Sequence, residues 1–344
     1  MLSDKMKNKF HQPHDAWLSL KHILTLVRLE SKSSYQIGFC QMDSSTNDVI
    51  RDCPPFFKVY KDGRVERYFV TQPVPAGLDR TAGVQTKDVV ISPAVKARIF
   101  MPQSTTPGQK LPLLVHYHGG GFSIGSAFDT VTYKVVAPLV KQANIVVVSI
   151  DYRVAPEHPL PIAHDDSWVG LQWVASHANG QGPEPWLNDN ADPSRIFLAG
   201  ESAGANIAHF VAVLAGATKL VGLKIRGMLL VHPYFGTREP NDNELDKYVC
   251  PTSTEFDNDP IVNPAADPKL KEMACERVIV LVAEEDGFRN RREAYYETLT
   301  KSGWRGKVEF FETKGEGHCF HVVIDNHNTE VLKNKMVDFI NKDI

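Results

Sequence analysis

The pattern of apolar and polar positions predicts short strands early in the chain and buried strands later. Residues 56–69 alternate on either side of Asp62-Gly63, a dipeptide that favours a tight turn, and so predict a hairpin. Residues 87–102 predict a second pair of short strands. Nearly continuous apolar segments, typical of parallel strands covered on both faces, lie within 110–122, 144–153, 195–200, 224–235, 277–287 and 307–318.

Helical periodicity separates these strands. Apolar residues recur every three or four positions in 165–178, in 205–216, in 292–302 and in the closing segment 329–342. Gly303 follows the third segment, where glycine commonly ends a helix. Strands that alternate with helices predict an α/β fold, with a mostly parallel sheet and helices on both of its faces.

Residues 1–41 differ from the rest of the chain. They are rich in basic side chains and carry one apolar helical stretch, and a polar lead-in follows Met42. We expect 1–41 to be an N-terminal extension that is disordered or artefactual, with a transit peptide or a membrane-surface helix as alternatives. Residues 42–344 are then enough for one complete α/β domain.

Composition argues against several classes of function. The chain of 344 residues has a formal net charge of −3, which gives no basic footprint for nucleic acid. No apolar run approaches the ~18 residues of a membrane span, so we expect no stable membrane association. The five cysteines are odd in number and widely spaced, and no N-glycosylation sequon occurs. Both features favour a reducing, cytoplasmic setting without a disulfide framework or a zinc site.

The strongest chemical signal is Gly200-Glu201-Ser202-Ala203-Gly204, which matches the pattern G-x-S-x-G. It lies between an apolar strand and a helix, where a tight turn between small residues lifts the serine hydroxyl clear of the sheet. The same turn places the backbone N–H of Ala203 at a helix N-terminus, which favours negative charge. The motif therefore predicts a nucleophile at Ser202, against the alternative of a small-residue packing turn.

A glycine-rich loop upstream supplies the second motif. His118-Gly119-Gly120-Gly121 follows an apolar strand, and glycines let backbone N–H groups approach a reacting carbonyl. We expect Gly120, Gly121 and Ala203 to form an oxyanion hole, because acyl transfer generates negative charge on that carbonyl oxygen. His118 is expected to support the loop through hydrogen bonds. A flexible loop without this role is the alternative.

The acid and the base of such a triad follow the serine in sequence. Asp286 ends an acidic cluster after a late strand and is the preferred acid, with Glu284 as the weaker choice. His318 lies in the loop after the last strand and is the preferred base, whereas His321 follows within an apolar run. His318 would take the Ser202 proton while Asp286 fixes the ring tautomer, and no metal or organic cofactor is required.

Together these motifs resemble those of the plant carboxylesterases of the hormone-sensitive-lipase group. The resemblance runs from about Phe56 to the C-terminus and implies an α/β-hydrolase fold, a cap over the site and hydrolysis of small carboxylic esters. It also implies buried ion pairs of Asp151, Arg153 and Glu157. The segments that carry it are HGGGF, DYRVAPEHPLP, HDDSWVGLQWVASH, GESAGANIAH, VHPYF, AEEDGFRNR and GEGHCFH.

Two relatives in this group define the alternatives. Hydroxyisoflavanone dehydratases resemble the chain closely and suggest a lyase on the same triad, and gibberellin receptors suggest a non-catalytic ligand receptor. The receptors lack the catalytic histidine that is present here as His318, so hydrolysis of a small-molecule ester is preferred. The segment 236–248 is shorter than is usual in the family, which places the completeness of the cap in question. Family members are monomers or weak homodimers, and we expect the same here.

Overall fold

The structure is a computed structural model that describes residues 48–106, 108–236, 245–251 and 258–342. The proposed extension 1–41 and residues 237–244 of the shortened segment lie outside the described residues.

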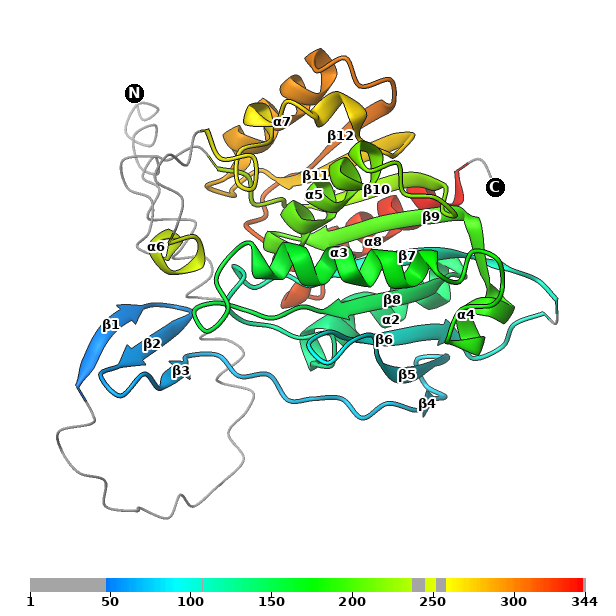
Figure 1. Cartoon of the computed structure of the whole chain (residues 1–344), viewed down its shortest axis with the longest axis horizontal. Helices are drawn as coiled ribbons and strands as arrows, with labels where there is room; N and C mark the ends of the chain where they lie inside the picture. The colour runs from blue at the N-terminus through cyan, green and yellow to red at the C-terminus, as the bar shows by residue number, and fades with distance from the viewer. Residues whose placement is uncertain (1–47, 107, 237–244, 252–257, 343–344) are drawn as a thin grey trace, which may run out of the picture.

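A sheet of nine strands runs through the described part of the chain (Figure 1). Its strands are β4 (Leu78–Asp79), β5 (Val84–Val90), β6 (Lys96–Pro102), β7 (Leu111–Tyr117), β8 (Val146–Asp151), β9 (Ala191–Glu201), β10 (Ile225–Val231), β11 (Arg277–Ala283) and β12 (Lys307–Thr313). They lie in the order β12-β11-β10-β9-β7-β8-β6-β5-β4. All pairings from β12 to β8 are parallel, and β6, β5 and β4 add antiparallel pairings, so the predicted mostly parallel sheet is confirmed.

Helices cover both faces of this sheet (Figure 1). The helices on one face are α3 (Ile162–Ala175), α5 (Ala203–Ala217) and α7 (Arg289–Lys301), and those on the other are α2 (Thr130–Ala143) and α8 (His327–Asn341). Because successive side chains of a strand point to opposite faces, each central strand serves two cores. In β9, Ile196 and Leu198 join the core beneath α5, whereas Phe197 and Ala199 join the core beneath α8.

Smaller elements complete the described chain. They are β1 (Val49–Cys53), β2 (Phe57–Tyr60), β3 (Val65–Arg67), α4 (Pro185–Asn190), α6 (Asp246–Val249) and 3₁₀ turns at Pro264–Ala266, Leu270–Glu272 and Phe320–Val322. The strands β1, β2 and β3 form a separate antiparallel sheet, and the N–H of Gly63 bonds the carbonyl of Tyr60 in the turn, which confirms the predicted hairpin. The Phe57 ring packs edge-on against Tyr248 of α6 at 6.0 Å, so this sheet supports the described end of the shortened segment.

The apolar pattern does not predict α2. Its sequence is rich in β-branched residues and has Pro138 inside the helix, and both features lower helix propensity. The Asp129 carboxylate caps the helix by accepting a hydrogen bond of 2.8 Å from the N–H of Thr132. Val136 and Val140 are completely buried against the sheet. Tertiary packing and a good cap therefore outweigh poor local propensity.

The ion pairs expected after β8 form only in part. Arg153 pairs with Asp166 of α3 at 2.8 Å, because its guanidinium faces that helix. Glu157 pairs with Arg67 of β3 at 2.7 Å, but its side chain is 43% exposed, so this pair is not buried. Asp151 accepts hydrogen bonds from the loop before α2 and makes no ion pair among the described residues. The expectation was therefore wrong for Asp151 and for the burial of Arg153 and Glu157, whose side chains are 37% and 43% exposed.

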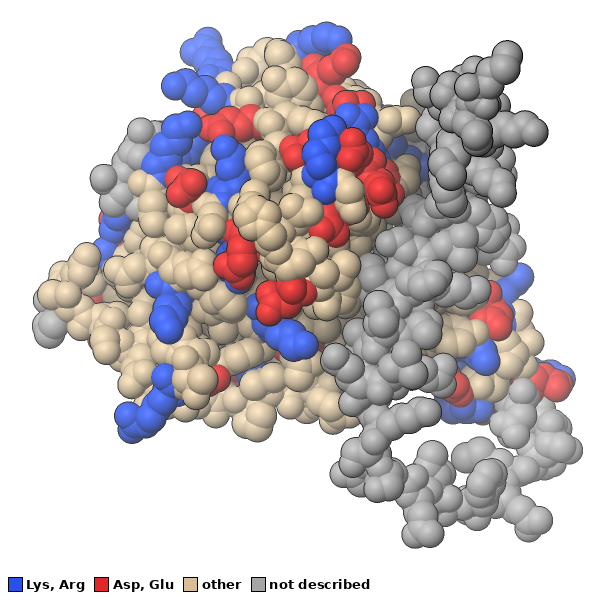
Figure 2. Space-filling view, turned by 180° about the vertical axis from the view of Figure 1, so that it is seen from behind, with Lys and Arg blue, Asp and Glu red and all other residues tan. Residues whose placement is uncertain are grey.

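Charges of both signs are mixed on one face of the molecule. On the face seen in Figure 2, Lys and Arg side chains lie among Asp and Glu side chains and do not gather into a patch of one sign. Such a surface gives little long-range steering to a strongly charged partner. Within the described ranges, no helix combines the length and the apolar character needed to cross a membrane.

Candidate active site

Ser202 occupies the turn between β9 and α5. Its backbone has φ 52° and ψ −113°, a strained conformation for a residue with a side chain. The neighbouring strand β10 and the loop after it hold this turn in place. The N–H of Ser202 bonds the carbonyl of Val231 at 2.9 Å, and its carbonyl accepts the N–H of Tyr234 at 3.0 Å. The strain is thus maintained by hydrogen bonds on both sides of the serine.

Gly200 and Gly204 allow α5 to approach the sheet closely. A Cβ atom on Gly204 would lie 2.0 Å from the carbonyl oxygen of Tyr117 in β7, and one on Gly200 would lie 2.3 Å from the carbonyl of Gly204. Neither position has room for a larger residue. The small residues of the motif therefore serve the close packing of helix on strand that exposes the serine.

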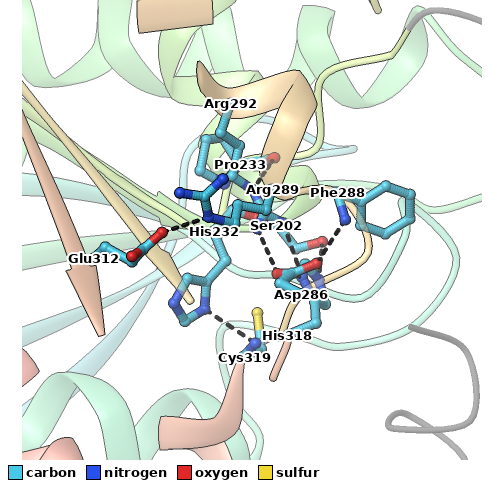
Figure 3. Close-up of polar contacts among 10 residues, drawn as sticks. All are labelled: Ser202, His232, Pro233, Asp286, Phe288, Arg289, Arg292, Glu312, His318 and Cys319. Atoms are coloured by element: carbon cyan, nitrogen blue, oxygen red, sulfur yellow. Dashed lines mark hydrogen bonds and ion pairs between the residues drawn. The ribbon is translucent and has the colours of Figure 1, made fainter. Parts of the chain in front are cut away.

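The structure brings Ser202, His318 and Asp286 together (Figure 3). His318 Nε2 lies 2.9 Å from Ser202 Oγ, and His318 Nδ1 lies 2.7 Å from Asp286 Oδ2. Asp286 follows β11, and His318 follows β12. Because β12, β11, β10 and β9 follow one another in the sheet and pair in parallel, their carboxyl ends deliver all three residues to one edge of the sheet. The arrangement can move a proton from the serine hydroxyl to a ring that a carboxylate orients.

The Asp286 carboxylate is buried and accepts several hydrogen bonds. Its Oδ1 accepts the N–H of Phe288 at 3.0 Å, and its Oδ2 receives both His318 and the guanidinium of Arg292. Glu284, the weaker choice for the acid, instead bonds Lys314 at 2.9 Å, and its side chain is 43% exposed. The structure therefore places Asp286, and not Glu284, against the histidine.

His321, the alternative base, lies in the 3₁₀ turn just after His318. Its ring nitrogens are buried, and the ring packs against His232 with ring centres 5.4 Å apart. Among the described residues, neither of its ring nitrogens has a hydrogen-bond partner. Burial lowers the pKa of His321 to about 4, so its ring is neutral. It belongs to the packing beneath the site and does not reach the serine hydroxyl.

The charges of the triad influence each other strongly. Burial alone would raise the pKa of Asp286, but the Arg292 guanidinium and the His318 ring outweigh it and hold this pKa well below its usual range. Burial alone would lower the pKa of His318, but the Asp286 carboxylate outweighs it and raises the pKa above the ordinary value. Asp286 is therefore ionised, and it favours the protonated form of the ring.

The glycine-rich loop lies beside the serine turn. A Cβ atom on Gly119 would meet the carbonyl oxygen of Glu201 at 3.0 Å. Gly120 has φ +117°, and a Cβ atom there would lie 2.1 Å from the carbonyl of Ile124. No backbone hydrogen bond within the described ranges occupies the N–H of Gly120 or Gly121. These donors, together with the first N–H of α5 at Ala203, suit a developing oxyanion.

His118 packs within this loop. Its Nδ1 donates a hydrogen bond of 2.8 Å to the carbonyl of Gly119, and its ring stacks on Tyr152 with centres 4.1 Å apart. The Tyr152 hydroxyl in turn donates a hydrogen bond of 2.6 Å to the carbonyl of His118. Burial lowers the pKa of His118, which keeps the ring neutral and suited to this packing role.

Sequence reasoning missed Arg292 and His232, which flank the triad (Figure 3). Arg292 is completely buried on α7, although it stands in a mostly polar segment that gives no signal of burial. His232 follows β10, and its Nδ1 accepts the N–H of Cys319 at 3.0 Å. His232 lies in VHPYF, one of the segments that carry the family resemblance, but the sequence contains no sign of what this histidine would bind.

A second buried pair, also missed, lies under the nucleophile turn. His116 of β7 bridges two neighbours: its Nδ1 lies 2.9 Å from Ser149 Oγ and its Nε2 lies 3.0 Å from Glu201 Oε2. Burial alone would raise the pKa of Glu201, but His116 outweighs it and the pKa is lowered. Glu201, the residue before the serine, therefore holds the turn to β7 through a buried carboxylate.

Among the described residues, no group of three or more His, Cys, Asp or Glu side chains is arranged to hold a metal ion. The candidate site consists of side chains and backbone donors that suffice for acyl transfer.

Comparison with known proteins places this site in a family context. Residues 114–322 match the family profile of the α/β-hydrolase fold. The chain is 39% identical over 322 residues to "Probable carboxylesterase 4, mitochondrial" of Arabidopsis thaliana, covering 88% of this chain and 86% of that protein. It is 38% identical over 320 residues to "2-hydroxyisoflavanone dehydratase" of Glycyrrhiza echinata, covering 86% and 98% respectively.

Solved structures show the same likeness. A hyperthermophilic esterase from the archaeon Pyrobaculum calidifontis superposes with a TM-score of 0.61 at 26% identity, covering 74% of this chain and 85% of the esterase. These matches confirm the resemblance drawn from the motifs and the predicted fold class. The chain belongs to the plant carboxylesterase family of the α/β-hydrolase fold.

Proposed function

We propose that this protein hydrolyses small carboxylic esters through an acyl-Ser202 intermediate. The observation that carries the proposal is the unbroken contact from Ser202 Oγ to His318 Nε2 and from His318 Nδ1 to Asp286, at 2.9 and 2.7 Å. Serine is a weak nucleophile unless an adjacent base removes its proton, and this contact supplies the base.

In acylation, His318 Nε2 accepts the hydroxyl proton as Ser202 Oγ attacks the ester carbonyl carbon. The carbonyl oxygen becomes an oxyanion that the N–H groups of Gly120, Gly121 and Ala203 would stabilise, at about 3–4 kcal/mol for each donor. The tetrahedral intermediate then collapses. The bond to the alkoxide breaks, and the leaving oxygen takes the proton from His318.

Deacylation repeats the same steps with water. His318 removes a proton from water, whose oxygen attacks the acyl carbon, and the proton then returns to Ser202 Oγ as the carboxylic acid leaves. Asp286 remains ionised throughout and stabilises the imidazolium formed in each half-reaction. Every proton that His318 accepts is therefore returned within the cycle, and the enzyme is regenerated.

Two measurements test this proposal. We expect hydrolysis of p-nitrophenyl acetate and covalent labelling of Ser202 by a fluorophosphonate, located by peptide mass spectrometry. Ser202→Ala should no longer be labelled, and its kcat for ester hydrolysis should fall about 10⁶-fold while the circular dichroism spectrum is unchanged. A folded protein that is neither labelled nor active would contradict the proposal and would favour a ligand receptor. A panel of esters of graded acyl length then defines the preference of the site.

A lyase on the same triad is the second candidate, favoured by the likeness to a protein named 2-hydroxyisoflavanone dehydratase. Elimination of water from a 2-hydroxyisoflavanone would need the base but not an acyl-serine. Mass spectrometry separates the two reactions. An acyl adduct of 42 mass units, about the size of an acetyl group, trapped on Ser202 during p-nitrophenyl acetate turnover supports esterase chemistry. Dehydratase turnover that survives Ser202→Ala supports the lyase.

The compartment and assembly are part of the same proposal. The odd cysteine number and the lack of sequons favour the cytoplasm, although the name of one relative places that protein in mitochondria. We propose a monomer or weak homodimer. A fluorescent fusion of the full chain tests the location, and light scattering after size-exclusion chromatography tests the assembly.

A further inference from the structure

Arg292 contacts both Asp286 and His318, the two residues proposed to form the triad with Ser202. Its Nη1 pairs with Asp286 Oδ2, and its Nη2 lies 3.0 Å from His318 Nδ1. Two backbone carbonyls hold the guanidinium in this place: Nε donates to Pro233 at 3.0 Å and Nη2 donates to His232 at 3.1 Å. The side chain is completely buried. An arginine cannot lose its proton in a protein, so a permanent positive charge lies inside the triad.

His318 Nδ1 cannot satisfy both of its neighbours at once. To bond Asp286 at 2.7 Å, Nδ1 must carry a proton, whereas to accept from Arg292 at 3.0 Å it must carry a lone pair. The shorter contact with the carboxylate favours the protonated nitrogen. The guanidinium then lies next to the N–H where positive charge grows as the ring becomes imidazolium, and it opposes that charge.

Few other charges face this ring. His232 and His321 lie nearby, and burial lowers the pKa of both, so these rings are neutral. Phe288 packs edge-on against His318 with ring centres 5.6 Å apart. The neighbouring Cys319 side chain adds to the effect of Asp286 and raises the pKa of His318. Arg289, on the same helix as Arg292, pairs with Glu312 of β12 instead. Among the described residues, the fixed charges in contact with His318 are therefore Asp286 and Arg292.

We propose that Arg292 is a positioning residue of the triad, which neutralises the Asp286 carboxylate and lowers the basicity of His318. This inference rests on the proposed function, because it assigns His318 the role of base. In chemical terms, Asp286 alone would hold the ring in its protonated form, which cannot accept the serine proton. Arg292 offsets this effect and returns a larger share of the ring to the neutral form at neutral pH.

The decisive experiment removes Arg292 without leaving an unpaired buried carboxylate. Asp286→Asn and the double variant Asp286→Asn with Arg292→Gln are compared by NMR titration of the His318 ring, assigned with His318→Gln. We expect the pKa of His318 to be higher in the double variant than in Asp286→Asn by at least about one unit, because the double variant lacks the positive charge that contacts the ring. Equal pKa values in the two proteins would overturn the proposal. This readout needs no turnover, so it reports on Arg292 even if the esterase assignment fails.

A second arm uses activity. Arg292→Gln should move the rising limb of kcat/KM against pH to higher pH by at least about one unit, and Arg292→Lys should shift it less because the charge is kept. Lys301→Gln is the matched control: it removes one positive charge from the same helix, where the side chain is 75% exposed, and should leave the limb in place. Superimposed profiles for wild type and Arg292→Gln, in folded and active protein, would also overturn the proposal.

Discussion

The ring of His232 holds the loop that carries His318, because its Nδ1 accepts the backbone N–H of Cys319 at 3.0 Å. His232 is itself buried with φ 46°, a conformation that asparagine tolerates better than most residues. Burial lowers its pKa well below the ordinary value, so Nδ1 remains an acceptor over the working pH range.

We therefore expect His232→Ala to lower kcat by about 10²-fold through a misplaced His318, with little change in KM. His232→Asn should recover much of this loss, because an amide oxygen can replace Nδ1 as the acceptor and the backbone conformation suits asparagine. Steady-state kinetics on a short-chain ester gives both values. Equal activity of the two variants would show that the hydrogen bond to Cys319 does not position the base.

The choice of acid has a direct test in two nearby carboxylates. Asp286→Asn should lower kcat by about 10⁴-fold, because the amide no longer fixes the tautomer in which Nε2 is free to accept a proton. Glu284→Gln, the matched control, should stay within about twofold, since the exposed side chain bonds only surface groups. If Glu284→Gln showed the larger loss, the assignment of the acid would be reversed.

The pH dependence of hydrolysis follows from the His318 ring. Only the neutral imidazole accepts the Ser202 proton, so kcat/KM should rise with pH as the ring loses its own proton. Because the Asp286 carboxylate raises the pKa of His318, the midpoint should lie above the ordinary histidine value of about 6.5. The profile is measured in buffers of constant ionic strength. A rate that does not change from about pH 5 to 8 would contradict the role of His318.

Helix–strand packing at the serine turn predicts a loss of stability. Gly204 lies in α5 with ordinary helical backbone, where alanine would normally favour the helix by about 1 kcal/mol. Its added Cβ would instead meet the Tyr117 carbonyl at 2.0 Å, so we expect Gly204→Ala to reduce the free energy of unfolding by about 1–3 kcal/mol.

Gly303→Ala is the control for this substitution, since no atom lies within 4 Å of the added Cβ and only the positive φ opposes it. Gly303→Ala should reduce the free energy of unfolding by about 1 kcal/mol, through backbone strain alone. Urea unfolding monitored by tryptophan fluorescence measures both variants. A Gly204→Ala protein as stable as wild type would mean that α5 can move away from β7 at no cost.

The sequence predicted those parts of the molecule that local pattern determines. Apolar runs located the buried strands, and the glycine spacing around Ser202 predicted the turn because close packing excludes other residues there. Asp286 and His318 could be proposed because the acid and the histidine follow the serine in that order along the chain, in loops after late strands. The α2 helix was missed because its cap and its packing, and not its propensity, stabilise it.

The remaining features depend on contacts between distant segments. Arg292 stands in a polar helix whose sequence gives no sign that one guanidinium turns inward to the triad. His116 and Glu201 are separated by 85 positions, and only the pairing of β7 with β9 makes them neighbours. Arg153 could be recognised as an ion-pair former, but its partner on α3 could not be chosen among the several acids nearby.

His318, the proposed base, lies in the loop after β12, which is the outermost strand of the large sheet and, in the described part of the chain, pairs only with β11. Strands at a sheet margin open at lower free energy than central ones, so β12 is expected to separate while β9, with its serine, is still intact. Esterase activity should therefore be lost on heating several degrees below the temperature at which the whole protein unfolds. Inactivation between these two temperatures should reverse on cooling, because β12 can pair again with a sheet that has stayed folded.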